Sequence, residues 1–327
     1  MYKKFYKLSR NPFEISPDPS FLFPTHRHNE ALAALYYGVR RHKGFVVLTG
    51  EVGTGKTLLV RCLLQLLRGT GVTYAYLFNS HLSSLEFLQY TAADFGLQTS
   101  GKGKADLLLE LGTFLVNRHQ KKLTTVLVAD EAHHLSEEVL EEIRLLTNLE
   151  TANGKLLQIL LVGQPELDEK LDSVELRQLK QRIALRSHLA PLDMQETSGY
   201  IQCRLQRAGA SHPIGEIFPQ ETVAEVQRYS RGIPRLINTI CENALIAGYA
   251  RQSGSISPEI IQEVGSDFRL NVVAKSKTEK SSYNEDNEVR NAVKTLLQFR
   301  DHLKSSPREQ ETPLIATSGV RKHEPIV

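Results

Sequence analysis

The sequence predicts an α/β fold, in which a parallel sheet is flanked by helices, followed by an all-helical module and a polar tail. Three observations support this prediction. Short apolar runs rich in β-branched residues alternate with longer segments of helical period. A glycine-rich loop at residues 50–57 joins one such run to the helix that follows it. Beyond residue 192 only helical patterns continue, and from about residue 271 the chain turns polar.

The composition is that of a folded protein with about two domains. The chain has 327 residues, of which 41% are hydrophobic and 24% charged, and its formal net charge is +3. That charge is too small to argue for nucleic acid. The three cysteines show no C-x-x-C spacing, which argues against disulfides and zinc and favours a reducing cytoplasm. We find no signal-peptide pattern and no apolar run of membrane-spanning length, so we expect a cytoplasmic protein.

The glycine-rich loop matches the phosphate-binding pattern G-x-x-x-x-G-K-[ST]. It lies between a strand-like run at 45–49 and a helical pattern at 58–67, which is the context that the motif requires. Backbone N–H groups of the loop would surround phosphates, Lys56 would reach the β- and γ-phosphates, and the Thr57 hydroxyl would bind Mg²⁺. We therefore predict a nucleoside triphosphate site. Its binding residues are Gly50, Glu51, Val52, Gly53, Thr54, Gly55, Lys56, Thr57 and Leu58.

The residues before the loop contain proline-broken segments and then a helical pattern from His28 to Arg41. Phe13, Phe21 and Phe23 lie in the first part. They either form a strap packed on the core or a wall for the nucleotide base, and the strap is the slightly preferred interpretation. After the loop helix, the pattern predicts a strand at 73–78 and helices at 83–95 and 104–119.

Two carboxylates follow the apolar run at 125–129. In a parallel sheet this end of a strand is where ligands bind. Asp130 would hold Mg²⁺, mostly through water, and Glu131 would act as general base on the attacking water. Solvated acids at a strand end are the alternative, which the upstream phosphate loop makes less favoured. His133 and His134 are adjacent and lack a third ligand, so we predict that they bind no metal.

Further candidates follow later strands. A buried strand at 156–163 ends at Gln164, which either senses the γ-phosphate or forms a turn before proline. Arg182 precedes a strand at 183–189, where it could reach the γ-phosphate of a neighbouring subunit or simply end a helix in solvent. Arg177 is the alternative candidate for that role. The stretch 136–150, which precedes the strand at 156–163, predicts an acidic amphipathic helix.

The second module contains helical patterns at 194–208, 220–230, 232–251 and from 258 onward. Arg235 stands at the start of a helix, where the helix dipole disfavours a cation, so we expect it to serve a bound phosphate. The predicted division is a nucleotide-binding α/β domain at 1–192, a helical lid at 193–270 and a flexible tail at 271–327. Residues 288–303 of the tail show helical spacing.

Together these features resemble the AAA+ ATPases, and more narrowly the ExeA family, the ATPase of general secretion pathway protein A and its relatives in exopolysaccharide export loci. The resemblance covers roughly residues 1–270 and is specific as a set. The matching segments are Asn11-Pro12-Phe13, Pro17-Asp18-Pro19, Phe21-Leu22-Phe23, residues 50–57, Asp130-Glu131-Ala132, Gly163-Gln164-Pro165-Glu166-Leu167, Gln181-Arg182-Ile183 and Gly232-Ile233-Pro234-Arg235.

The resemblance implies ATP and Mg²⁺, hydrolysis at the subunit interfaces of a homo-oligomer, and membrane-bound export or secretion partners. The secretion protein continues into a membrane span and a peptidoglycan-binding domain. Because neither is seen here, we expect a cytoplasmic ATPase closer to the stand-alone relatives, associated with the inner membrane through its partners. Two alternatives stay open, a DNA-associated ATPase of the transposition type and a slow nucleotide-gated switch. The four letters from Asp130 to His133 also match DEAH helicases, which the absence of a second RecA-like domain disfavours.

Overall fold

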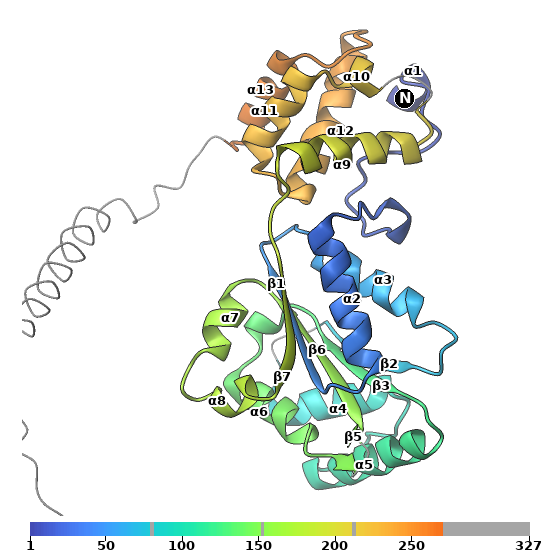
Figure 1. Cartoon of the computed structure of the whole chain (residues 1–327), viewed down its shortest axis with the longest axis vertical. Coiled ribbons are helices and arrows are strands. Elements are labelled where there is room, and N and C mark those ends of the chain that lie inside the picture. Colours follow the sequence, from blue (N-terminus) through green and yellow to red (C-terminus); the bar gives the residue numbers. More distant parts are fainter. Residues whose placement is uncertain (79–81, 152–153, 211–213, 271–327) are drawn as a thin grey trace, which may run out of the picture. The chain divides into compact units, whose positions relative to one another are not determined.

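The computed structural model describes residues 1–78, 82–151, 154–210 and 214–270. The predicted tail at 271–327, including the helical pattern at 288–303, lies outside these residues. The remainder forms a sheet with flanking helices and a group of helices that follows it, as Figure 1 shows.

The sheet has five parallel strands in the order β2-β3-β6-β1-β7 (Figure 1). β1 pairs with β6 on one side and β7 on the other, and β3 lies between β2 and β6. The predicted parallel α/β fold is therefore confirmed. The strands are β1 (Phe45–Gly50), β2 (Thr73–Leu77), β3 (Thr125–Ala129), β6 (Leu157–Gly163) and β7 (Ile183–Leu189).

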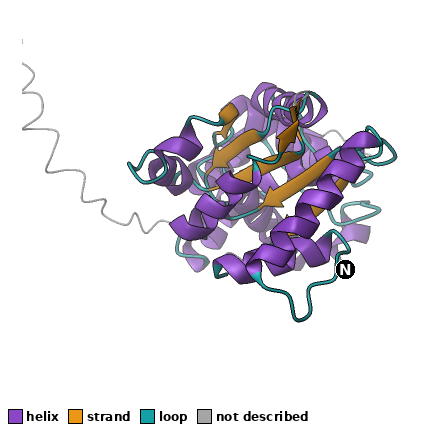
Figure 2. Ribbon diagram, turned by 90° about the horizontal axis from the view of Figure 1, so that it is seen from below, coloured by secondary structure: helices purple, strands orange, loops and turns teal. Residues whose placement is uncertain are grey.

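Helices cover both faces of this sheet (Figure 2). Alternate strand residues point to opposite faces, so Val46 and Leu48 pack against α2 and α3 while Phe45 and Val47 pack into the other layer. α2 (His26–Arg40) and α3 (Lys56–Leu66) form the first layer. The second layer contains α4 (Ser84–Asp94), α5 (Lys104–Gln120), α6 (Glu137–Leu146), α7 (Glu166–Leu171) and α8 (Arg177–Lys180).

The predicted helix at 136–150 is too long. α6 ends at Leu146, and Thr147 turns its hydroxyl back to the carbonyl of Arg144 at 2.6 Å. This local hydrogen bond competes with continuation of the helix, as is typical of threonine. The next residues instead form a small antiparallel pair, β4 (Glu150–Thr151) and β5 (Gly154–Lys155).

The helices after β7 form the lid. α9 begins behind Asp193, whose side chain caps the helix in a reciprocal pair with Glu196. The lid helices are α9 (Met194–Arg207), α10 (Ile214–Ile217), α11 (Gln220–Ser230), α12 (Pro234–Ala250) and α13 (Pro258–Asp267). Short elements that the sequence patterns did not predict are α1 (Tyr2–Phe5) and the 3₁₀ turns η1 (Pro19–Phe21) and η2 (Ala132–His134).

The first 13 residues, which we call the strap, pack into the lid and not into the α/β domain. Tyr2, Tyr6 and Phe13 share one buried cluster with the lid helices, and the Tyr2 hydroxyl donates to Glu242 at 2.7 Å. Arg204 donates to the backbone carbonyl of Pro12 at 2.8 Å. The predicted division places residues 1–13 with the α/β domain, whereas their apolar side chains are covered by helices that lie almost 200 positions later in the sequence.

None of the helices among the described residues combines the length and the apolarity that crossing a membrane requires.

Candidate functional site

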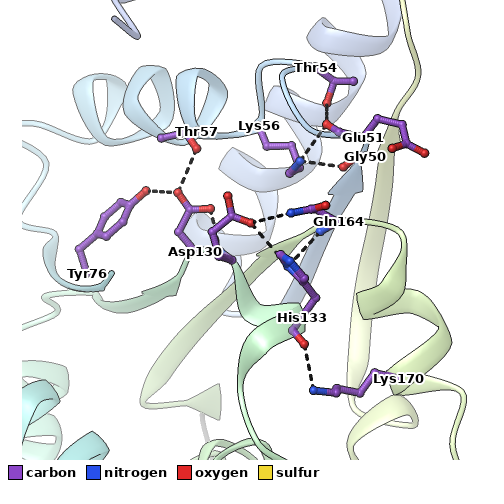
Figure 3. Close-up of polar contacts among 11 residues, drawn as sticks. Gly50, Glu51, Thr54, Lys56, Thr57, Tyr76, Asp130, His133, Gln164 and Lys170 are labelled. Atoms are coloured by element: carbon purple, nitrogen blue, oxygen red, sulfur yellow. Dashed lines mark hydrogen bonds and ion pairs between the residues drawn. The ribbon is translucent and has the colours of Figure 1, made fainter. Parts of the chain in front are cut away.

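Three strands end side by side and bring the predicted site residues together (Figure 3). β1 leads into the phosphate loop, β3 into Asp130 and Glu131, and β6 into Gln164. Parallel strands present their carboxyl ends at one edge of a sheet. The residues are therefore neighbours although more than 100 positions separate the loop from Gln164.

The lysine of the phosphate loop contacts the backbone of the loop itself. Lys56 donates to the carbonyl of Gly50 at 2.7 Å and to that of Glu51 at 3.0 Å. Burial lowers the pKa of Lys56, and the nearby carboxylates of Glu131 and Asp130 oppose that shift. The ammonium group of Lys56 is bound by neutral carbonyl groups, so an anionic ligand can replace them with stronger, charge-assisted hydrogen bonds.

Asp130 is the centre of the candidate metal site. Its Oδ2 accepts from the hydroxyls of Thr57 at 3.0 Å and Tyr76 at 2.8 Å, and its Oδ1 accepts from the backbone N–H of Glu131 at 3.0 Å. The Thr57 hydroxyl donates its hydrogen bond to the carboxylate, so the lone pairs of its oxygen remain free for a cation.

These residues fit Mg²⁺. The described part of the chain contains no group of three or more His, Cys, Asp or Glu side chains that could hold a metal by themselves. Mg²⁺ is commonly bound by one or two protein oxygens and completed by waters and substrate phosphates. A hydroxyl and a carboxylate beside a phosphate loop supply that partial set. His133 and His134 belong to no metal cluster of the described residues.

Glu131 occupies an unusual backbone position. Its φ of 52° and ψ of 37° place a non-glycine residue in the left-handed region, at a cost of about 1–3 kcal/mol. Its side chain is 48% exposed. Gln164 Nε2 lies 3.4 Å from Glu131 Oε2, and His133 Nδ1 lies 3.5 Å from the same oxygen. The strained turn therefore presents a carboxylate to solvent beside an amide, which is the arrangement for holding a water molecule.

His133 supports this pair. Its Nδ1 accepts from the backbone N–H of Gln164 at 3.4 Å, and Lys170 holds the His133 carbonyl at 2.9 Å (Figure 3). Burial, assisted by His134, lowers the pKa of His133, which favours the neutral ring that can accept.

A pocket of about 250 Å³ lies beside the loop. The phosphate loop forms one wall, residues Ile15–Asp18 a second, and lid residues Tyr200, Arg204, Arg235 and Asn238 a third. The backbone N–H of Arg235 donates to the Gly53 carbonyl at 3.2 Å, so the lid contacts the loop directly. Phe13 and Phe21 are buried and do not line this pocket, which agrees with the strap interpretation for these two aromatics.

The two candidate trans arginines lie elsewhere. Arg182 directly precedes β7, at the opposite edge of the sheet from the phosphate loop, and its guanidinium donates to Thr147 at 2.9 Å. Arg177 is exposed at the start of α8. Neither residue reaches the site of its own chain, and Arg177 is the more accessible of the two.

Several site residues escaped sequence reasoning. Tyr76 contacts Asp130, and His28 contacts the loop, with its Nε2 3.2 Å from the Thr54 carbonyl and its Nδ1 2.7 Å from Thr25. Tyr200, Arg204 and Asn238 line the pocket. Apolar periodicity could not identify Tyr76 and Tyr200, because an aromatic in a strand or a helix is usually a core residue. The polar residues among them belong to no motif that the sequence analysis used.

A phosphate loop, an acidic strand end, a polar strand end and a helical lid define this protein as a P-loop nucleotide-binding ATPase of the AAA class. The family model described as AAA domain matches residues 39–171. General secretion pathway protein A from Aeromonas hydrophila is 48% identical over 258 residues, which are 78% of this chain and 46% of that protein. The chain belongs to the AAA+ ATPases of the ExeA family. It spans about half the length of that relative.

Solved structures agree on the fold. The ORC2 protein of Aeropyrum pernix, in ADPNP–ADP complexes, has a TM-score of 0.59 at 18% identity and covers 79% of this chain and 72% of its own. Cdc6p from Pyrobaculum aerophilum has a TM-score of 0.56 at 17% identity, covering 81% and 70%. At this identity the likeness establishes the architecture only.

Proposed function

We propose that the protein is a Mg²⁺-dependent ATP hydrolase that assembles or remodels an envelope secretion or polysaccharide export system. The observation that carries the hydrolase part is the convergence of Lys56, the Thr57–Asp130 pair and the Glu131–Gln164 pair at one sheet edge (Figure 3). Each group serves one requirement of phosphoryl transfer to water.

The roles follow from the contacts. Lys56 exchanges its backbone carbonyls for the β- and γ-phosphates. Thr57 and Asp130 would hold Mg²⁺, which would supply positive charge beside the phosphates. Gln164 and Glu131 hold the attacking water between them, and Glu131 accepts its proton. Arg235, whose backbone already contacts Gly53, links the γ-phosphate to the lid.

An adenine nucleotide is the favoured ligand. The pocket beside the loop has room for part of a nucleotide, and Ile15 and Pro17 offer apolar contacts to a base. The similar ORC2 protein of Aeropyrum pernix was solved in ADPNP–ADP complexes.

The cellular role rests on the relative named for general secretion. In this proposal the protein acts on the cytoplasmic side of the inner membrane, where it binds membrane-bound components of the export or secretion system. We further propose a homo-oligomer, in which Arg182 or Arg177 reaches a neighbour's γ-phosphate.

The test compares Glu131→Gln with Glu137→Gln, a matched change at an exposed position of α6. We expect Glu131→Gln to retain ATP binding and lose hydrolysis by about 10²-fold or more, the range for removing a general base. The control should behave as wild type. Normal turnover in Glu131→Gln would refute the assigned role.

The oligomer is tested by measuring the ATPase rate per subunit against protein concentration. A rate that rises with concentration, and falls in Arg177→Ala or Arg182→Ala, supports a shared interface site. A flat profile with both variants unaffected removes the trans arginine and favours the nucleotide-gated switch.

A second candidate function, a DNA-associated ATPase, is favoured by one observation. The ends of α2 and α5 bring two basic segments to one pocket of about 650 Å³. Arg40, Arg41 and Lys122 line it together with His42 and His119. Among the described residues these three cations have no ion-pair partner. A concave cationic surface of this kind suits a phosphate backbone.

The hypothesis of a DNA-associated ATPase is tested by measuring binding of labelled duplex DNA at low and high salt. Binding that weakens steeply with salt, and is lost in the Arg40→Glu/Arg41→Glu double variant, supports it. The control is Lys3→Glu/Lys4→Glu on α1, which makes the same change of charge. Equal loss in both double variants would indicate nonspecific attraction, and absence of binding would remove this candidate.

A further inference from the structure

The hydroxyl of Tyr76 is a contact of the metal site that no motif includes. We infer that Tyr76 is a positioning residue for Mg²⁺: it holds the Asp130 carboxylate in its binding orientation, and the exposed ring of Phe78 holds Tyr76 in turn. This inference rests on the proposed function, because it concerns the same carboxylate.

The contact is short and sheltered. Tyr76 is buried, with 8% of its surface exposed, and its hydroxyl lies 2.8 Å from Asp130 Oδ2. The same oxygen accepts from Thr57, the second proposed metal ligand (Figure 3). Tyr76 thus fixes the position of Asp130 Oδ2, the oxygen that Thr57 also contacts.

The strand arrangement explains why this tyrosine reaches the site. β2 lies beside β3, and Tyr76 is opposite Val128, two residues before Asp130. The backbone of β2 is fixed there as well, because Asp94 Oδ2 accepts from the Tyr76 N–H at 2.6 Å. One residue further along β2, the Leu77 carbonyl accepts from the Asp130 N–H at 3.3 Å.

Phe78 supports the phenol from the solvent side. Its ring stacks on Tyr76 with centroids 4.4 Å apart and an interplanar angle of 27°. Phe78 is 71% exposed, so little other packing accounts for its place. Stacking disfavours other χ1 rotamers of Tyr76, which would carry the ring away from Phe78, and so keeps the hydroxyl beside the carboxylate.

The experiment measures the Mg²⁺ dependence of ATP binding, by titrating Mg²⁺ at fixed fluorescent ATP analogue. Groups that orient a metal ligand commonly change metal affinity by 10–100-fold. We expect Tyr76→Phe, which keeps the ring and the stack, to weaken apparent Mg²⁺ affinity about 10-fold. Phe78→Leu should weaken it less, in the same direction.

Tyr74→Phe is the matched control. Tyr74 lies on the same strand, is 46% exposed, and makes no contact with Asp130. A loss of Mg²⁺ affinity equal in Tyr74→Phe and Tyr76→Phe would overturn the inference. So would a loss of nucleotide binding in Tyr76→Phe that is the same with Mg²⁺ and with EDTA, because that pattern indicates a structural role.

A double-mutant cycle supplies a readout without metal or turnover. Tyr76→Phe and Asp130→Asn should be coupled in urea unfolding of the nucleotide-free protein, since they share one hydrogen bond. Additive effects would overturn the inference. Asp130→Asn is also the reference for the proposed function. If it leaves Mg²⁺ dependence intact, the metal site itself is wrong; if it abolishes that dependence while Tyr76→Phe does not, only the positioning role fails.

Discussion

The contact between the phosphate loop and the lid can be tested at Gly53. Its φ is +83°, and a Cβ built there would lie 2.6 Å from Arg235 Cβ and 3.1 Å from Ile233 Cγ2. Arg235 Cβ is fixed to its backbone, and that backbone donates to the Gly53 carbonyl. Gly53→Ala therefore cannot be relieved by a side-chain rotation and must push the start of α12 away.

Two costs add at this position. A left-handed φ costs an alanine about 1–2 kcal/mol, and overpacking a contact costs roughly 1–3 kcal/mol. Gly69→Ala isolates the first cost, because Gly69 has a similar φ of +78° and an added Cβ there would contact nothing within 4 Å. The alanine restricts the unfolded chain equally in both variants. We therefore expect Gly53→Ala to be less stable than Gly69→Ala by roughly 1–3 kcal/mol.

Urea unfolding of the nucleotide-free proteins measures this difference. Omitting nucleotide separates the contact with the lid from any effect on phosphate binding. Equal midpoints and slopes for the two variants would show that α12 does not rest on the loop in solution, and the argument for Arg235 as a link between phosphate and lid would fall with it.

Other perturbations have directions that follow from burial. Burial lowers the pKa of His28 below its usual 6.5. Below that pH the unfolded chain therefore binds a proton at this residue more readily than the folded protein does. The free energy of unfolding should fall as the pH drops from about 7 to about 5. That pH slope should be smaller in His28→Leu, and the exposed His26→Leu should keep it, as urea unfolding at each pH would show. Lys56→Met should abolish ATP binding by calorimetry without lowering the melting temperature, since a desolvated cation is removed; a large drop in melting temperature would contradict this. Arg204→Met should cost about 2 kcal/mol, the scale of a charged hydrogen bond to the strap, and speed proteolysis within residues 10–20; unchanged cleavage would contradict that anchoring role.

The predictions that held depend on local patterns. The loop at 50–57 and the pair Asp130–Glu131 are contiguous in sequence and follow apolar runs, so strand order alone brings them to one edge. Gln164 could be predicted for the same reason. The positions of these residues at one edge are observed, whereas the roles of all of them in binding and catalysis, and those of Arg182 and Arg235, stay predictions.

What escaped prediction depends on contacts between distant segments. Tyr76 reaches Asp130 because β2 pairs with β3 in one register, which periodicity does not specify. The strap carries apolar residues, but nothing in their spacing tells which of two cores covers them. The end of α6 at Leu146 was missed because the apolar spacing continues through Leu149, while Thr147 ends the helix by a local hydrogen bond.

The packing of the strap into the lid has a mechanical consequence. The lid is joined to the α/β domain by two stretches of chain, residues 14–25 and residues 190–193. A domain with a single connection can rotate about any axis through it. With two connections, rotation of the lid is restricted to a hinge axis that passes through both. Ile15–Asp18 lie on the first connection and also line the nucleotide pocket. A base in this pocket would contact the first connection and the lid together, because Tyr200 and Asn238 of the lid line the same pocket.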